Sequence, residues 1–189
     1  MTDSEDSGPR APDGAPDARA ERVAPPRAHQ AEVGAVIEAA LSEMDVPVVR
    51  EGDDAILVTL PGERRYRTLV WLIVGAHEVL VESFVCRQPD ENHDEVYRFL
   101  LQRNAKLRTV AYALDAVGDI HLVGRIPVGS VTAAEIDTVL GVVLAASDAD
   151  FNPILERGFT SAIRREWAWR TSRGESVRNL QAFRHLIEG

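Results

Sequence analysis

Residues 66–86 read YRTLVWLIVGAHEVLVESFVC, and the pattern of this stretch limits the fold classes open to the chain. Residues 66–74 are rich in Val, Leu, Ile and Trp on both faces, which is typical of a central strand. Gly75-Ala76-His77 then predicts a turn. Residues 79–86 alternate between two sets of side chains, the period of a second strand. The stretch therefore predicts two successive strands joined by a turn.

Further strands are predicted on both sides of this stretch. Upstream, a short strand over residues 46–50 and another over residues 55–60 are separated by the turn sequence Glu51-Gly52-Asp53-Asp54. Downstream, residues 109–115 and 120–125 form a predicted hairpin. Val117-Gly118-Asp119 supplies its turn.

Helices are predicted between and after these strands. Apolar side chains recur at three- and four-residue spacing over residues 28–44, which indicates one apolar helix face. A second helix is predicted over residues 91–106, with acidic residues at its start and basic residues at its end, as the helix dipole favours. Thr132 and Glu135 have the spacing of a capping box and predict the start of a third helix. Asn152 followed by Pro153 predicts the start of another, and residues 177–187 predict a last short helix.

The order of these elements predicts an α+β domain, with an antiparallel sheet flanked by helices in the order α-βββ-α-ββ-α. We expect the domain to cover residues 28–189, with residues 150–189 as a helical C-terminal extension. Residues 1–27 carry five of the ten prolines and almost no large apolar side chain. Such a segment cannot bury enough surface to offset its chain entropy, so we expect a disordered tail.

Composition narrows the possible environments and partners. The formal net charge of -9 argues against general affinity for nucleic acid, because phosphate binding needs clustered Lys and Arg. Cys86 is the single cysteine, and in its alternating apolar run we expect a buried, inert thiol and a reducing cytoplasm. We expect no signal peptide, because residues 1–14 are polar and acidic, and no membrane span, because the apolar runs are far shorter than the ~20 residues that one needs.

The motifs of common catalytic and cofactor sites are missing from the sequence. There is no glycine-rich phosphate loop, no G-x-S-x-G nucleophile elbow, and no pair of histidines at metal-ligand spacing. We therefore expect no catalytic residues, no cofactor and no metal, so the protein is not expected to be an enzyme. A site assembled from residues distant in sequence stays open at this point.

The C-terminal segment departs from the acidic character of the chain. Residues 157–184 contain seven arginines and two tryptophans. Trp167 and Trp169 lie about 200° apart around a helix, so both cannot face the same core. The segment could be structural or dimeric packing, a partner surface, or a surface that stacks on single-stranded bases. The candidate partner or dimer surface consists of Arg164, Arg165, Trp167, Trp169, Arg170 and Arg173.

The residues near this end also resemble a known family. Phe151-Asn152-Pro153-Ile154-Leu155, then Gly158-Phe159, then residues 165–170 (REWAWR) resemble the C-terminal part of actinobacterial YbjN-domain proteins, described as bacterial sensory transduction regulators. The predicted element order is similar to the type III secretion chaperone-like fold of that family. The resemblance implies a small, acidic, cytoplasmic dimer that binds segments of other proteins, and it implies no catalytic residue.

These observations lead to two hypotheses of function. The first is a non-enzymatic, protein-binding regulator or chaperone-like protein that acts through a helix or sheet surface, as a homodimer and without a membrane. The second is a nucleic-acid-binding protein that uses the C-terminal Arg/Trp helix.

Overall fold

The computed structural model describes residues 27–188, so the predicted tail over residues 1–27 lies outside the described part except for its last residue. The helices and strands follow the order α1 (Arg27–Glu43), β1 (Val48–Glu51), β2 (Ala55–Pro61), β3 (Arg67–Val74), β4 (Glu78–Cys86), α2 (His93–Asn104), β5 (Val110–Leu114), β6 (Ile120–Pro127), α3 (Ala133–Gly158), α4 (Thr160–Ser172) and α5 (His185–Glu188). Two 3-10 helices, η1 (Val128–Ser130) and η2 (Arg178–Phe183), connect some of them.

The six strands form one sheet in the order β1-β2-β3-β4-β6-β5, and every neighbouring pair is antiparallel. The predicted α+β class is confirmed. Four strands stand between the first two helices, one more than the order α-βββ-α-ββ-α counts. The first is the short strand predicted over residues 46–50, which pairs with β2 as an edge strand. The β5–β6 hairpin is also confirmed.

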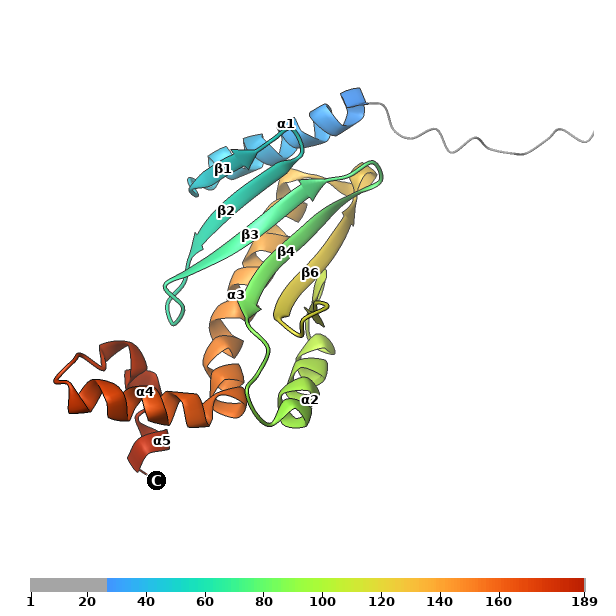
Figure 1. Cartoon of the computed structure of the whole chain (residues 1–189). Coiled ribbons are helices and arrows are strands. Elements are labelled where there is room, and N and C mark those ends of the chain that lie inside the picture. Colours follow the sequence, from blue (N-terminus) through green and yellow to red (C-terminus); the bar gives the residue numbers. More distant parts are fainter. Residues whose placement is uncertain (1–26, 189) are drawn as a thin grey trace, which may run out of the picture.

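Helix α3 is the scaffold of the molecule. It runs along one side of the sheet and packs on β3, β4 and β5, while α1 and α2 pack on α3 (Figure 1). Its side chains Ile136, Val139, Leu140 and Val143 are essentially inaccessible to solvent. By length and apolar composition alone α3 could also cross a membrane, a property that it shares with the core helices of many soluble proteins.

The predicted start of a separate helix at Asn152 is wrong. Helix α3 continues through Pro153 to Gly158. A proline removes one backbone donor from a helix, but it does not end the helix where packing compensates. Ile154 is fully buried beside it, and the Arg157 guanidinium donates a 2.7 Å hydrogen bond to the Pro153 carbonyl. The extension predicted from residue 150 therefore begins inside α3. Thr132 caps α3 as predicted, since its Oγ1 accepts from the Glu135 N–H at 3.2 Å, which is one of the two hydrogen bonds of a capping box.

Two other helix predictions needed adjustment. The second helix begins at His93 and not at residue 91, because Asn92 adopts a left-handed conformation with φ of 53°. The predicted last helix over residues 177–187 is instead η2 followed by α5. Together with α4 these elements form a C-terminal arm, defined here as residues 159–188. Figure 1 shows α4 projecting away from the sheet at one end of α3.

Candidate functional site

The sheet has one face packed against helices and one that no helix of residues 27–188 covers (Figure 1). Successive side chains of a strand point to opposite faces. Val58, Val70, Leu72 and Val81 are buried on the helix side. The side chains between them point away from the helices, and we call this second side the open face.

The open face is largely apolar. The strand registers place one row of cross-strand neighbours across the whole sheet, in the order Val49, Leu57, Trp71, Glu82, Val123 and Ala111. Val49, Leu69 and Phe84 are 54%, 37% and 46% exposed. Leu57, Trp71, Ile73, Leu80 and Val123 are half-buried. The charged side chains of this face are Glu51, Arg67, Glu78, Glu82 and Arg125. Arg125 pairs with Glu78, and Glu82 lies among the apolar side chains of the row.

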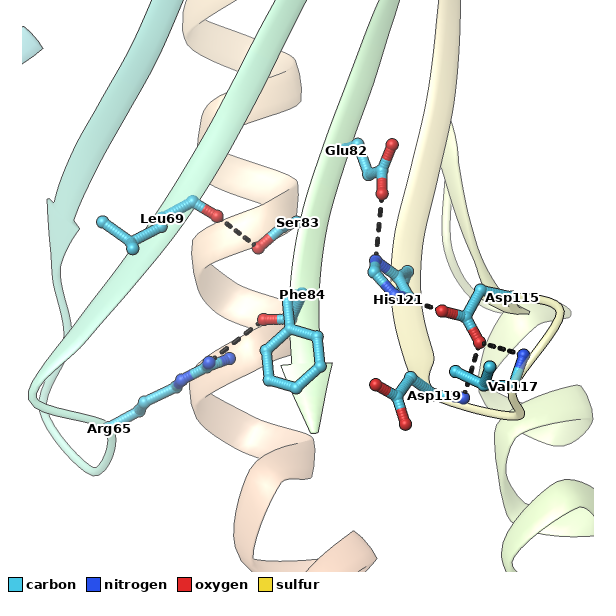
Figure 2. A network of polar contacts seen from close by, with 9 residues as sticks. All are labelled: Arg65, Leu69, Glu82, Ser83, Phe84, Asp115, Val117, Asp119 and His121. Carbon is cyan, nitrogen blue, oxygen red and sulfur yellow. Dashed lines mark hydrogen bonds and ion pairs between the residues drawn. The ribbon is translucent and has the colours of Figure 1, made fainter. Parts of the chain in front are cut away.

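The open face changes shape where β3 and β4 separate. Their paired residues run only from Trp71 opposite Glu82 to Val74 opposite Val79. Beyond this point side chains bridge the strands (Figure 2). The buried Ser83 hydroxyl donates to the Leu69 carbonyl at 2.7 Å. Leu69 and Phe84 therefore lie where β3 and β4 have separated, and a side-chain hydrogen bond joins the strands there in place of backbone pairing.

Arg65 is the second bridge at this end. Its guanidinium donates to the Phe84 carbonyl and to the Ser147 hydroxyl of α3, both at 3.0 Å. The same guanidinium lies 5.0 Å from the centre of the Phe151 ring. Burial lowers the pKa of Arg65 from its usual high value. Arg65 thus ties the strand end that carries Phe84 to the scaffold helix.

A histidine between two carboxylates borders the apolar surface (Figure 2). His121 Nδ1 lies 3.1 Å from Glu82 Oε1, at an angle that makes no hydrogen bond, and Nε2 lies 3.7 Å from Asp115 Oδ2. Burial opposes ionisation of Asp115. Hydrogen bonds from the backbone N–H groups of Asp119 and Val117, with the charge of His121, outweigh it and lower the Asp115 pKa. This corner of the open face is therefore acidic.

The Arg/Trp residues singled out in the sequence lie in the C-terminal arm and not on the open face. Arg164 donates to the Leu186 carbonyl at 2.8 Å, and Arg170 pairs with Glu166 at 2.6 Å, so both hold the arm together. Arg165 is exposed on α4. The Arg173 guanidinium stacks 4.8 Å from the centre of the Trp169 ring.

The two tryptophans point in different directions, as the helix geometry predicts. Trp167 is partly buried and packs against the hydrophobic core, while Trp169 is 45% exposed. Within the described residues, Arg164, Arg165, Arg173 and Arg178 make no ion pair. The exposed residues of the candidate surface are Arg164, Arg165, Trp169 and Arg173.

Two side chains of a kind used in catalysis, Cys86 and Asp148, are engaged structurally. Burial raises the pKa of Cys86 to about 12, so its thiol stays protonated at neutral pH. A hollow of about 400 Å³ lies between the β2–β3 loop and α3. Glu63 and Asp148 are its acidic lining residues, and the Asp148 carboxylate already accepts from the backbone N–H groups of Arg64 and Arg65 at 2.8 and 2.9 Å. Among residues 27–188, no group of three His, Cys, Asp or Glu side chains is arranged to hold a metal ion.

The open face was missed in the sequence, although its signal was present. Residues 66–74 are apolar on both sides, a pattern that suggested a strand buried on both faces. In the structure only one of these sides is covered, so Leu69, Trp71 and Ile73 reach the surface. The identity of the covered side depends on where α3 packs, which the strand pattern does not contain.

Comparison with known proteins adds a family. The family model YbjN, described as "Putative bacterial sensory transduction regulator", matches residues 34–156. The protein is 59% identical over 140 residues to "Uncharacterized protein ML2442" of Mycobacterium leprae, covering 74% of this chain and 76% of that protein. It is 60% identical over 132 residues to "Uncharacterized protein Rv0487" of Mycobacterium tuberculosis, covering 70% and 72%.

Two solved protein complexes contain chains with a similar fold. The HopA1-SchA chaperone-effector complex matches with a TM-score of 0.50 and 12% identity, over 65% of this chain and 95% of the matched chain. The ExsC-ExsE complex matches with a TM-score of 0.49 and 16% identity, over 65% and 93%. At these identities the likeness concerns the fold.

Proposed function

The chain belongs to the YbjN family, and we propose that it is a non-enzymatic, protein-binding regulator or chaperone-like protein whose binding surface is the open face of its sheet. The observation that carries this proposal is the apolar character of a sheet face left without a helix layer. Antiparallel sheets covered on one side normally present polar side chains on the other. Here that side presents Leu57, Trp71 and Ile73.

The physical argument concerns the free energy of hydration. Apolar surface in contact with water is unfavourable by roughly 25 cal/mol per Å² relative to burial, so a continuous apolar patch favours any partner that covers it. Large aromatic side chains contribute most to such interfaces. Trp71 and Phe84 supply the aromatic side chains here. The carboxylates of Glu82 and Asp115 lie near them and would select the orientation of a bound partner.

Two further points support a protein as the partner. SchA was solved bound to the effector HopA1, so a related fold is compatible with a protein ligand. The negative net charge of this chain disfavours a polyanion on the sheet. We also propose that the protein works in the cytoplasm as a homodimer, without metal or cofactor.

The proposal can be tested by affinity capture with matched variants. The immobilised protein, the double variant Leu69→Ser/Phe84→Ser and the control Leu101→Ser are exposed to the same lysate. Leu101 is 69% exposed on α2, outside the open face. The proposal expects the wild type and the control to retain the same proteins and the double variant to lose them. Equal capture by all three would contradict it.

A second candidate function is nucleic-acid binding by the C-terminal arm. One observation in its favour is the exposed Trp169, on whose ring Arg173 stacks. Another is that several arginines of the arm, Arg164, Arg165, Arg173 and Arg178, make no ion pair with described residues. Binding of this kind is strongest at low salt. Single-stranded RNA or DNA whose gel mobility is unchanged by the protein at low salt would eliminate this candidate, while a shift abolished by Trp169→Ser would support it.

A further inference from the structure

The C-terminal arm (residues 159–188) has properties opposite to those of the rest of the chain. Its six arginines and three glutamates give it a formal charge of +3, whereas the whole chain carries -9. Trp169 is exposed on it, beside Arg173. Solvent-exposed Trp next to Arg is the residue combination that dominates protein interfaces. The arm therefore presents a basic, aromatic surface, and no acidic side chain of the described residues pairs with its Arg173.

The base of the arm is fixed to the domain. The Ser161 N–H and hydroxyl both bind the Glu91 carboxylate, at 2.6 and 2.9 Å. The Arg87 guanidinium lies 4.9 Å from the centre of the Phe159 ring. These contacts direct α4 away from the sheet of its own chain (Figure 1). The arm thus has a defined direction, and its exposed tip points outward.

The open face offers the complementary chemistry. It presents the apolar side chains of Leu69, Trp71 and Phe84 with acidic groups beside them. Arg67 and Arg125 also lie on this face, and Arg125 is already paired with Glu78. Glu51, Glu82 and Asp115 have no arginine partner among the described residues; the last two contact only His121 as an ion-pair partner. An arginine that approached Glu82 would gain a charge-assisted contact, and an indole beside it would bury apolar area.

We propose that the arm of one copy docks on the open face of a second copy, with Trp169 on the apolar surface and Arg173 and Arg165 directed to its carboxylates. The docking is reciprocal, so a symmetric pair contains two arm–face contacts. This inference rests on the proposed function, in which the open face is a protein-binding surface. Because one face holds one occupant, a partner segment and the arm compete for it, and the arm shields the apolar face when no partner is bound.

Complementation between two defective variants tests this arrangement. Trp169→Ser/Arg173→Ser removes the tip of the arm, and Leu69→Ser/Phe84→Ser removes the surface that it meets; all four positions are exposed, so thermal melts are expected to stay close to the wild type. In sedimentation at micromolar concentration, we expect wild type and the Leu101→Ser control to be dimers and each double variant alone to be a monomer. An equimolar mixture of the two double variants keeps one intact contact and is expected to form a heterodimer.

Several results would overturn the arrangement. In sedimentation, these results are a monomeric wild type, an arm variant that dimerises as well as the wild type, or an equimolar mixture of the two double variants that stays monomeric. Lysate capture separates this failure from that of the proposed function. If the face variant loses its captured proteins but the arm variant still dimerises as well as the wild type, the docking inference is wrong and the proposed function stands. If the face variant keeps its captured proteins, the proposed function falls.

Discussion

The ring of Phe84 meets the imidazole of His121 edge to face, with 5.4 Å between their centroids and an interplanar angle of 79°. The two residues are register partners on β4 and β6, and they join the apolar part of the open face to its acidic corner. Edge-to-face geometry is favourable between aromatic rings and holds both side chains in one orientation. The apolar surface is thus preorganised although no described helix covers it.

The open face is expected to be dispensable for folding. Leu69→Ser/Phe84→Ser removes two exposed side chains, so the free energy of unfolding should fall by only about 1 kcal/mol. Chemical denaturation followed by circular dichroism measures this, with Leu101→Ser as the matched control. A loss as large as that of a buried leucine, about 3 kcal/mol or more, would show that these side chains belong to a covered core.

A buried polar network is expected to be important for stability. The Asp150 carboxylate accepts from the Arg103 guanidinium at 2.7 Å and from the Tyr112 hydroxyl at 2.9 Å. Asp150→Ala removes this acceptor from Arg103 and leaves the Tyr112 hydroxyl only the Ala146 carbonyl, at 3.2 Å, so it should lower the free energy of unfolding by about 2–3 kcal/mol. Asp137→Ala, at an exposed position of the same helix, should change it by less than about 0.5 kcal/mol. Equal effects in denaturant titrations would refute this role.

Acid sensitivity is expected at the β2–β3 loop. Burial opposes ionisation of Asp148, but hydrogen bonds from the backbone N–H groups of Arg65 and Arg64 outweigh it, so its pKa lies below the usual value. A carboxyl with a lowered folded-state pKa stabilises the fold above its unfolded-state pKa. The stabilisation is lost as the pH falls through the folded-state value.

The isosteric variant Asp148→Asn isolates this contribution. At pH 7 it should be less stable than the wild type by about 1 kcal/mol, because a charged acceptor is replaced by a neutral one. The difference should shrink as the pH falls below about 4 and Asp148 becomes protonated. Thermal unfolding over a pH series measures it. A difference that is the same at pH 3 and pH 7 is incompatible with this assignment.

The single cysteine is expected to be unreactive in the folded protein. Burial raises the pKa of Cys86 to about 12, so at pH 8 the thiolate population is about a thousand-fold below that of a free thiol. Alkylation by iodoacetamide, followed by mass spectrometry, should be slow in buffer and fast in denaturant. Rapid modification without denaturant would contradict the burial of this thiol.

The local elements were predictable and their mutual contacts were not. Alternation over residues 79–86 and the turn residues before them were enough to place β4, since strand period is a local property. The directions of Trp167 and Trp169 also followed from helix geometry. By contrast, the hydrogen bonds from Arg64 and Arg65 to Asp148 join residues more than 80 positions apart. No local pattern marks such a pair.

The open face illustrates the same limit at a larger scale. A strand that is apolar on both sides fits a sheet between two layers, and it fits equally a sheet with one exposed binding face. The choice depends on the number of helices that pack on the sheet and on the side that they take. Here α3 fills one side, and the C-terminal segment that could have covered the other forms an arm directed away from it.

The most direct test of the open face as the protein-binding surface is site-specific photo-crosslinking. A photoreactive phenylalanine analogue is placed at position 84 on the open face or at position 101 on α2, and each protein is irradiated in a lysate. Both native side chains are exposed, so both variants should fold. The account predicts discrete protein adducts from position 84 and none from position 101. If position 84 gives no adduct beyond those of position 101, the open face is not the binding surface.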